Sequence, residues 1–127
     1  MTKRVLDVGQ CQPDHGAIRR LVRGEFGAEV VQADRLDDAL AQLRAGRFDL
    51  VLINRKLDVD YSDGIEILQA IKADAELAST PVMLVTNYAE HQQAAIAAGA
   101  EPGFGKAELN RAETRDKLAK FLGQGGR

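Results

Sequence analysis

The sequence predicts an α/β fold, in which helices cover both faces of a doubly wound, five-stranded parallel sheet. Short apolar runs alternate five times with segments whose apolar residues recur at helical spacing. The run DLVLI at residues 49–53 is almost continuously apolar, as expected of a central parallel strand that is buried on both faces. At 127 residues, 45% of them hydrophobic, the chain has the size of one domain with a single core.

Each expected element has its own local signals. The expected strands are the apolar runs at residues 4–8, 28–32, 49–53, 81–86 and 102–105. Helices are expected after Pro13 and at residues 35–46, 65–74, 89–99 and 109–122. Pro13 suits a first helical turn, Asp34 is expected to cap the second helix, and Gly46 and Gly99 close helices. This order gives a domain at residues 1–122 and a flexible tail at residues 123–127.

Composition excludes several classes of function. A formal charge of −2, from 17 basic and 19 acidic residues, gives no general attraction for nucleic acid or an anionic membrane. The single Cys11 excludes an intrachain disulfide. No signal pattern and no apolar run of membrane-spanning length is present, so a cytoplasmic setting is expected.

A polar residue, Asn54, stands where the central strand ends. In doubly wound folds, ligands bind and reactions occur at the carboxyl ends of the strands. An aspartate at this position could act as a nucleophile and as a metal ligand, whereas an asparagine performs neither role well. The position therefore suggests a site whose reaction has been lost or was never present.

Several segments together resemble the receiver domain of two-component response regulators. RFDLVLI followed by DGIEILQAIK resembles the family's third strand and third helix, and STPVMLVTNYAE resembles its fourth strand, which ends in a hydroxyl residue, here Thr86. AAGAEPGFGKAEL is similar to the segment that carries the family's site lysine, here Lys106. The resemblance covers nearly the whole chain. It implies the CheY-like form of the flavodoxin-like fold, with strand order 2-1-3-4-5 and a site at the carboxyl ends of strands 1, 3 and 5.

The resemblance also implies that the phosphorylation chemistry of the family is missing. Receivers use carboxylates to hold Mg²⁺, and one of these carboxylates takes up the phosphoryl group. The family's acidic pair falls on Gln10 and Cys11, or on Gly9 and Gln10, and its acceptor aspartate falls on Asn54. We therefore expect no catalytic residue, no enzymatic activity, no resident metal or other cofactor, and weak or absent Mg²⁺ binding.

Other positions also depart from the family pattern. The loop at residues 54–64 is about two residues longer than usual and lacks the family's proline. The position of the family's aromatic switch residue holds Gly103, and Phe104 follows it. Ala107 stands where proline usually follows the lysine, so no cis peptide is expected there.

Some residues leave alternatives open. Asp7 or Asp58 could act as a substitute carboxylate, and Asn54, Thr86, Gly105 and Lys106 could instead bind a small anion. Asp7 otherwise pairs with a neighbour such as Lys106. A calcium loop at residues 58–69 is disfavoured, because its glycine comes one place late and Gln69 occupies the closing position. His15 and His91 are expected at exposed helix positions. Cys11 is either a reactive thiol or a small buried side chain.

The resulting expectation is a stand-alone, receiver-like protein in two-component phosphorelay signalling that is not phosphorylated and acts by binding another protein. The partner would be a histidine kinase, a regulator or an output protein, with neither nucleic acid nor membrane involved. The family's output surface corresponds to residues 88–122, where Tyr88, Ala94 and Phe104 are the candidate contacts. The sequence gives no indication of the oligomeric state.

Overall fold

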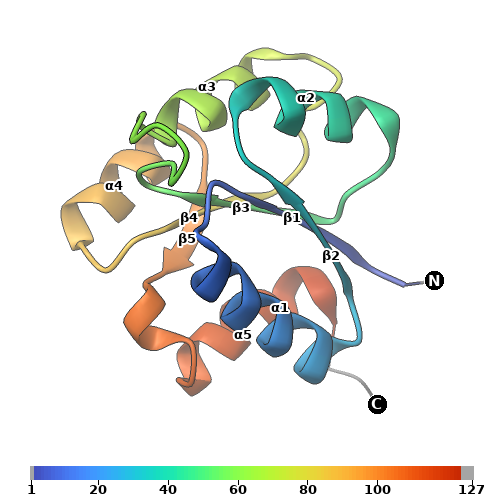
Figure 1. The fold of residues 1–127 in the computed structure, drawn as a ribbon, viewed down its shortest axis with the longest axis vertical. Helices are drawn as coiled ribbons and strands as arrows, with labels where there is room; N and C mark the ends of the chain where they lie inside the picture. The colour runs from blue at the N-terminus through green and yellow to red at the C-terminus, as the bar shows by residue number, and fades with distance from the viewer. Residues whose placement is uncertain (1, 124–127) are drawn as a thin grey trace.

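The computed structural model describes residues 2–123, which form a five-stranded parallel sheet with the order β2-β1-β3-β4-β5 (Figure 1). The strands are β1 (Arg4–Val8), β2 (Glu29–Ala33), β3 (Leu50–Asn54), β4 (Val82–Val85) and β5 (Glu101–Phe104). The helices are α1 (Gln12–Phe26), α2 (Leu36–Ala45), α3 (Ile65–Ala73), α4 (Ala89–Ala97) and α5 (Ala112–Leu122), with a short 3₁₀ turn, η1 (Lys106–Glu108). The predicted architecture and strand order are confirmed.

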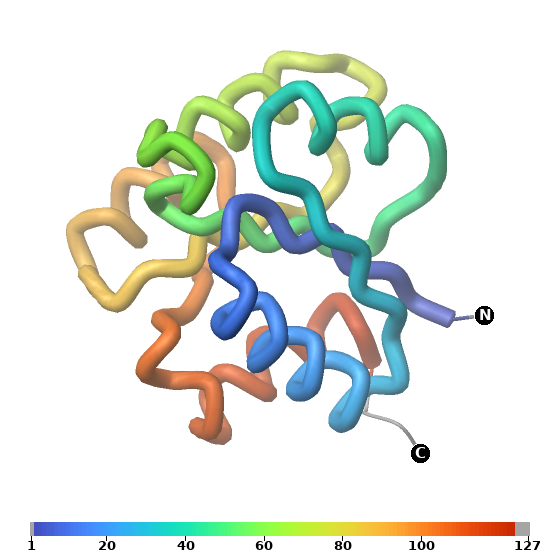
Figure 2. Tube along the Cα trace, viewed as in Figure 1, coloured from blue at the N-terminus to red at the C-terminus, as the bar shows by residue number. Residues whose placement is uncertain are grey.

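The helices divide into two layers, one on each face of the sheet. Helices α1 and α5 cover one face, and α2, α3 and α4 cover the other, as the ribbon and the tube both show (Figures 1 and 2). Each layer closes its own cluster of buried apolar side chains, one with Ile18, Val22 and Leu118 and the other with Ile67, Leu68 and Ile71. Strand β3 is buried along its whole length, as its apolar sequence predicts.

Two local expectations are wrong. The last helix begins at Ala112 instead of Leu109, because the chain first forms η1. Asp34 does not cap α2; the carboxylate of Asp38 does so, by accepting hydrogen bonds from the backbone N–H groups of Asp34 (2.8 Å) and Arg35 (2.7 Å). The last residues of the expected tail, 124–127, lie outside the described part of the chain.

The parallel register brings the carboxyl ends of the strands together at one edge of the sheet. Strand β3 lies between β1 and β4, with Val8 beside Ile53 and Asn54 beside Val85. The loop after β3 lies over the turn from β1 to α1, where the Asp58 N–H donates to the carbonyl of Gly9 (2.9 Å) (Figure 2). Among residues 2–123, no helix has the length and apolar character needed to cross a membrane.

Candidate functional site

An open pocket of about 410 Å³ lies at the carboxyl ends of β3 and β4. It is lined by residues from the β1–α1 turn, the loop after β3, the β4–α4 loop and η1: Cys11, Asn54, Arg55, Lys56, Asp58, Tyr61, Val85, Thr86, Asn87, Tyr88 and Lys106. The pocket therefore contains Asn54, Thr86 and Lys106, three of the four residues that the sequence suggests for an anion site; Gly105 does not line it.

Asn54 occupies the centre of the site, but its amide is used to hold the loops. The side chain is 9% exposed, and its Nδ2 donates a hydrogen bond to the carbonyl of Gly9 (3.0 Å). The start of α3 packs directly on the backbone of Asn54: a Cβ on Gly64 would lie only 2.1 Å from the Asn54 carbonyl oxygen. Asn54 thus connects the β1–α1 turn to β3.

Lys106 is held by a carboxylate that sequence reasoning missed. Its Nζ lies 2.8 Å from Oδ2 of Asp14 in the first turn of α1. The hydrogen bond from Lys106 is the main reason that the pKa of Asp14 lies below its usual value. The Cys11 thiol donates to the same oxygen (3.2 Å). Cys11 is half-buried and lines the pocket.

The positions of the family's acidic pair supply no charge in either alignment. Gly9 has φ +81°, and a Cβ there would lie 2.4 Å from the side chain of Leu57, so this turn favours glycine. Gln10 is 2% exposed, and neither polar atom of its amide forms a hydrogen bond within the described residues. Cys11 precedes the first residue of α1 and contributes only its thiol.

Asp7 lies inside β1 and does not reach the pocket. Its side chain is fully buried, and Oδ2 lies 2.7 Å from Nδ1 of His15 on α1. Burial raises the pKa of Asp7, and the contact with His15 opposes that effect. The nearby Gln10 amide also lowers the pKa of Asp7, although Gln10 forms no hydrogen bond of good geometry. A substitute carboxylate at Asp7 and an exposed His15 are therefore wrong expectations. Asp7 does pair with a neighbour, but the neighbour is His15; Lys106, the partner named in the sequence analysis, only lowers the pKa of Asp7 through its charge and pairs with Asp14.

Asp58 does line the pocket and is exposed. The loop around it is a compact turn: Leu57 is buried, its N–H donates to the Ser62 carbonyl (2.9 Å), and Lys56 forms an isolated bridge with Asp63. Asp63 accepts from the N–H of Ile65 (3.1 Å) at the start of α3.

The donor set does not fit Mg²⁺, which binds through carboxylates and retains several of its waters. Asp58 is the only carboxylate among the described residues that line the pocket, and Asp14 is already paired with Lys106. Within residues 2–123, no group of three or more histidine, cysteine, aspartate or glutamate side chains is placed to hold a metal, and this includes the loop at residues 58–69.

A hydrogen-bonded glutamine joins β4 to β5 beside the pocket. The Nε2 of Gln92 on α4 donates to the carbonyls of Leu84 (2.9 Å) and Thr86 (3.3 Å), and its Oε1 accepts from the N–H of Gly103 (3.0 Å). A Cβ on Gly103 would lie 2.2 Å from the Leu84 carbonyl oxygen, so no side chain fits at this position. Thr86 accepts from the N–H of Tyr88 (3.3 Å) through its Oγ1.

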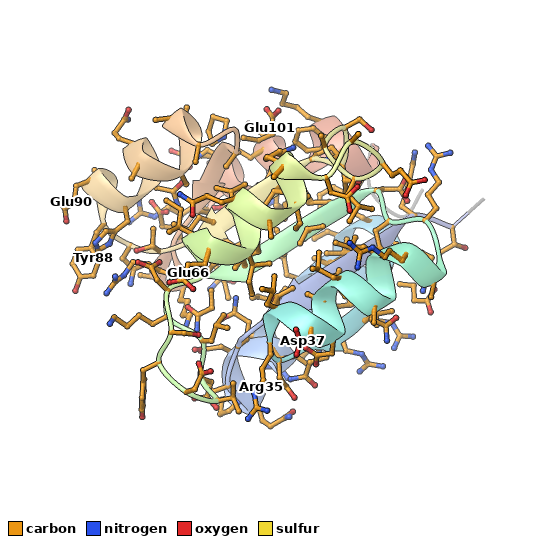
Figure 3. All side chains as sticks on the ribbon, turned by 90° about the horizontal axis from the view of Figure 1, so that it is seen from above. Arg35, Asp37, Glu66, Tyr88, Glu90 and Glu101 are labelled. Atoms are coloured by element: carbon orange, nitrogen blue, oxygen red, sulfur yellow. The ribbon has the colours of Figure 1, made fainter. Side chains whose placement is uncertain are left out.

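The expected partner residues are only partly at the surface. Tyr88 is 59% exposed and projects with Glu90 from the outer edge of the molecule (Figure 3), and Ala94 is exposed on α4. Phe104 is 1% exposed and packs in the core with Met83 and Leu118, so its assignment to the partner surface is wrong. In a strand as short as β5, which has four residues, the alternation of residues does not tell which side chain points inward. His91 packs edge-on against Tyr88.

Comparison with known proteins gives consistent matches. Residues 14–116 match the family model described as the response regulator receiver domain. The chain is 32% identical over 114 residues to chemotaxis protein CheY-3 of Vibrio cholerae, with 86% of each chain covered. It is 32% identical over 83 residues to chemotaxis protein CheY of Pseudomonas aeruginosa, covering 65% of each. The signal receiver domain of a DNA-binding response regulator from Colwellia psychrerythraea superposes with a TM-score of 0.82 at 22% identity, covering 96% of this chain and 99% of that one.

Proposed function

Because this chain belongs to the response regulator receiver domain family, we propose that it is a two-component signalling protein that works without taking a phosphoryl group on an aspartate. It acts by binding another signalling protein: a histidine kinase, a regulator or an output protein. The observation that carries the proposal is Asn54, which occupies the acceptor position and donates its amide N–H to Gly9. An amide used in this way is neither a nucleophile nor a strong cation ligand.

The pairing of Lys106 supports the same conclusion. In the family's chemistry, a lysine at this position contacts the phosphoryl oxygens, so its charge faces the acceptor. Here its Nζ is 2.8 Å from Asp14, which partly neutralises it. We propose that Lys106 serves as a structural link between η1 and the start of α1, and that Mg²⁺ binding is weak or absent.

The region between β4 and β5 gives a second line of support. In the family's usual coupling, a hydroxyl residue and an aromatic side chain change position together. Gly103 has no side chain, Phe104 is buried in the core, and Gln92 bonds to both strands. We infer that this chain keeps one arrangement of α4 and β5, which it presents to its partner.

A restoration series tests the loss of phosphorylation chemistry. The variant Asn54→Asp alone should remain unlabelled by acetyl phosphate and Mg²⁺, because its carboxylate would lie beside Arg55 and Lys56 with too few ligands for the metal. We expect that Gln10→Asp and Cys11→Asp are needed in addition. Labelling of Asn54→Asp at the rate of an ordinary receiver would show that a working metal site is still present.

A second experiment tests the partner surface. Ala94→Arg places a long charged side chain on the exposed face of α4, where the chain offers small residues beside Tyr88. Once a partner has been cross-linked and identified in the source cells, Ala94→Arg and Tyr88→Ala should weaken its binding while circular dichroism and thermal melting stay unchanged. The matched control is Ala75→Arg, at an exposed alanine after α3. Unchanged binding by both folded variants would place the output surface elsewhere.

A further inference from the structure

Both tyrosines of the chain, Tyr61 and Tyr88, line the same pocket, and both are strongly exposed. Tyr61 is 74% exposed and Tyr88 59%. They come from different loops, one after β3 and one before α4. Tyrosine is enriched at binding surfaces because its ring is apolar and its hydroxyl polar, and two exposed rings at one concave site indicate a flat, apolar ligand group.

The loop that carries Tyr61 is fixed in position. Its base, Leu57, is 2% exposed and packs in the core, and the Tyr61 N–H donates to the Leu57 carbonyl (2.7 Å). Tyr61 has φ +59°, a left-handed conformation that is rare for a bulky residue. The backbone thus accepts strain and holds an aromatic ring at the pocket, where a glycine would be the unstrained choice.

The same pocket has an excess of positive charge. Arg55, Lys56 and Lys106 line it, against the single carboxylate of Asp58. Lys106 is paired with Asp14, whereas Arg55 and Lys56 form no ion pair with any residue in the described range 2–123. The backbone of Arg55 is held on both sides, because its N–H donates to Val85 and its carbonyl accepts from Gly64. Arg55 and Lys56 are therefore two cationic side chains without carboxylate partners among the described residues, and the backbone that carries Arg55 is held in place.

We propose that this pocket binds a nucleoside phosphate, with the base against Tyr61 and Tyr88 and the phosphate against Arg55 and Lys56. Proteins bind single-stranded nucleic acids through aromatic rings that stack on the bases and cationic side chains that contact the phosphates, and a nucleoside phosphate presents the same two groups. A pocket of about 410 Å³ has the size of a small-molecule site. Binding would give this protein an input other than phosphorylation, and it does not depend on whether Asn54 has lost the acceptor role.

The chain provides its own probes for a test. Its only tyrosines and its only cysteine, Cys11, all line the pocket, and it has no tryptophan. In a titration with guanosine 5′-monophosphate, NMR should show that the ring signals of both tyrosines move and saturate together. The nucleotide should also slow the alkylation of Cys11 by iodoacetamide. Ribose 5-phosphate and guanosine, each lacking half of the ligand, should bind more weakly.

Variants on the exposed loop locate the site without endangering the fold. By calorimetry, Tyr61→Ala should weaken binding roughly fivefold or more through lost stacking. Lys56→Ala should weaken it roughly twofold to fivefold, as expected for an exposed charge. Arg19→Ala removes an exposed arginine of α1 that does not line the pocket, and it should bind like the wild type.

Three results would overturn the proposal. One is the absence of any tyrosine shift or Cys11 protection at millimolar nucleotide. Another is binding of ribose 5-phosphate as tight as that of the nucleotide, which would reduce the pocket to a simple anion site. The third is an equal loss of affinity in Arg19→Ala and Lys56→Ala. None of these results bears on labelling by acetyl phosphate, so the phosphorylation proposal is tested separately.

Discussion

Replacing His15 by alanine should destabilise the protein by about 3 kcal/mol at pH 8. His15 is the only hydrogen-bond partner of the fully buried Asp7 carboxylate within residues 2–123, at 2.7 Å, and the second oxygen of that carboxylate already lacks a partner. Leaving a buried carboxylate without its hydrogen-bond donor typically costs about 3 kcal/mol or more, because an unsatisfied charged group costs more than a neutral one. We take the lower end, because a buried carboxyl can bind a proton instead of remaining ionised.

The sign of the pH dependence follows from Asp7. Burial raises the pKa of this carboxyl in the folded state, so the folded protein binds its proton more tightly than the unfolded chain does. The tighter binding of this proton stabilises the folded protein fully below the ordinary carboxyl pKa, and the stabilisation is lost as the pH rises through the raised pKa. Without His15 the pKa of Asp7 rises further, so the stability that the bound proton of Asp7 contributes should be lost at a higher pH in His15→Ala than in the wild type.

Urea unfolding followed by circular dichroism measures these free energies, and a double variant supplies the control. Asp7→Val places an apolar side chain in a strand whose neighbours Val5 and Val8 are buried, so it removes the buried charge itself. Asp7→Val/His15→Ala should therefore recover most of the loss seen in His15→Ala. The reasoning is refuted if His15→Ala unfolds at the same urea concentration as the wild type at pH 8, or if the double variant is no more stable than His15→Ala.

Two further pairs of variants test the packing around the site by the same urea assay. Gly64→Ala should lower the free energy of unfolding by about 2 kcal/mol or more, because the new Cβ would lie 2.1 Å from the Asn54 carbonyl oxygen. Its control is Gly24→Ala on α1, where a Cβ would meet nothing within 4 Å; this variant should be neutral or more stable by up to about 1 kcal/mol. Equal effects of the two would contradict the contact with Asn54. Gln92→Ala should cost about 1 to 2 kcal/mol through its lost bonds to β4 and β5, whereas its exposed neighbour Gln93→Ala should change stability by less than about 0.5 kcal/mol. A Gln92→Ala variant as stable as Gln93→Ala would show that these bonds contribute nothing.

The fold could be predicted because its signals are local. Apolar runs, helical spacing and turn residues each lie within a few positions of one another, and their order fixes a parallel sheet. The end of the central strand located Asn54, and the resemblance to receiver domains located Thr86 and Lys106; the structure brings all three to one pocket.

The contacts that determine how the site behaves could not be predicted in this way. Lys106 meets Asp14, and Gln92 meets Gly103, only when distant elements pack together. The sequence places Asp7 within an apolar run, but its partner His15 lies on a helix whose rotation against the sheet the sequence does not specify. Asp14 is visible in the sequence as an acidic residue in the first turn of α1. Acidic residues are common at this position because they stabilise the start of a helix, so Asp14 alone does not indicate a partner for Lys106.

The most direct test of the loss of aspartyl phosphorylation is the intact mass of the wild-type protein after incubation with acetyl phosphate and Mg²⁺. We expect no addition of a phosphoryl mass, because Asn54 stands at the acceptor position and Asp58 is the only carboxylate among the described residues lining the pocket. A receiver that takes up the phosphoryl group under the same conditions is the positive control. A clear adduct that maps to Asp58, or to any other aspartate, would contradict the account and restore phosphorylation as the input of this protein.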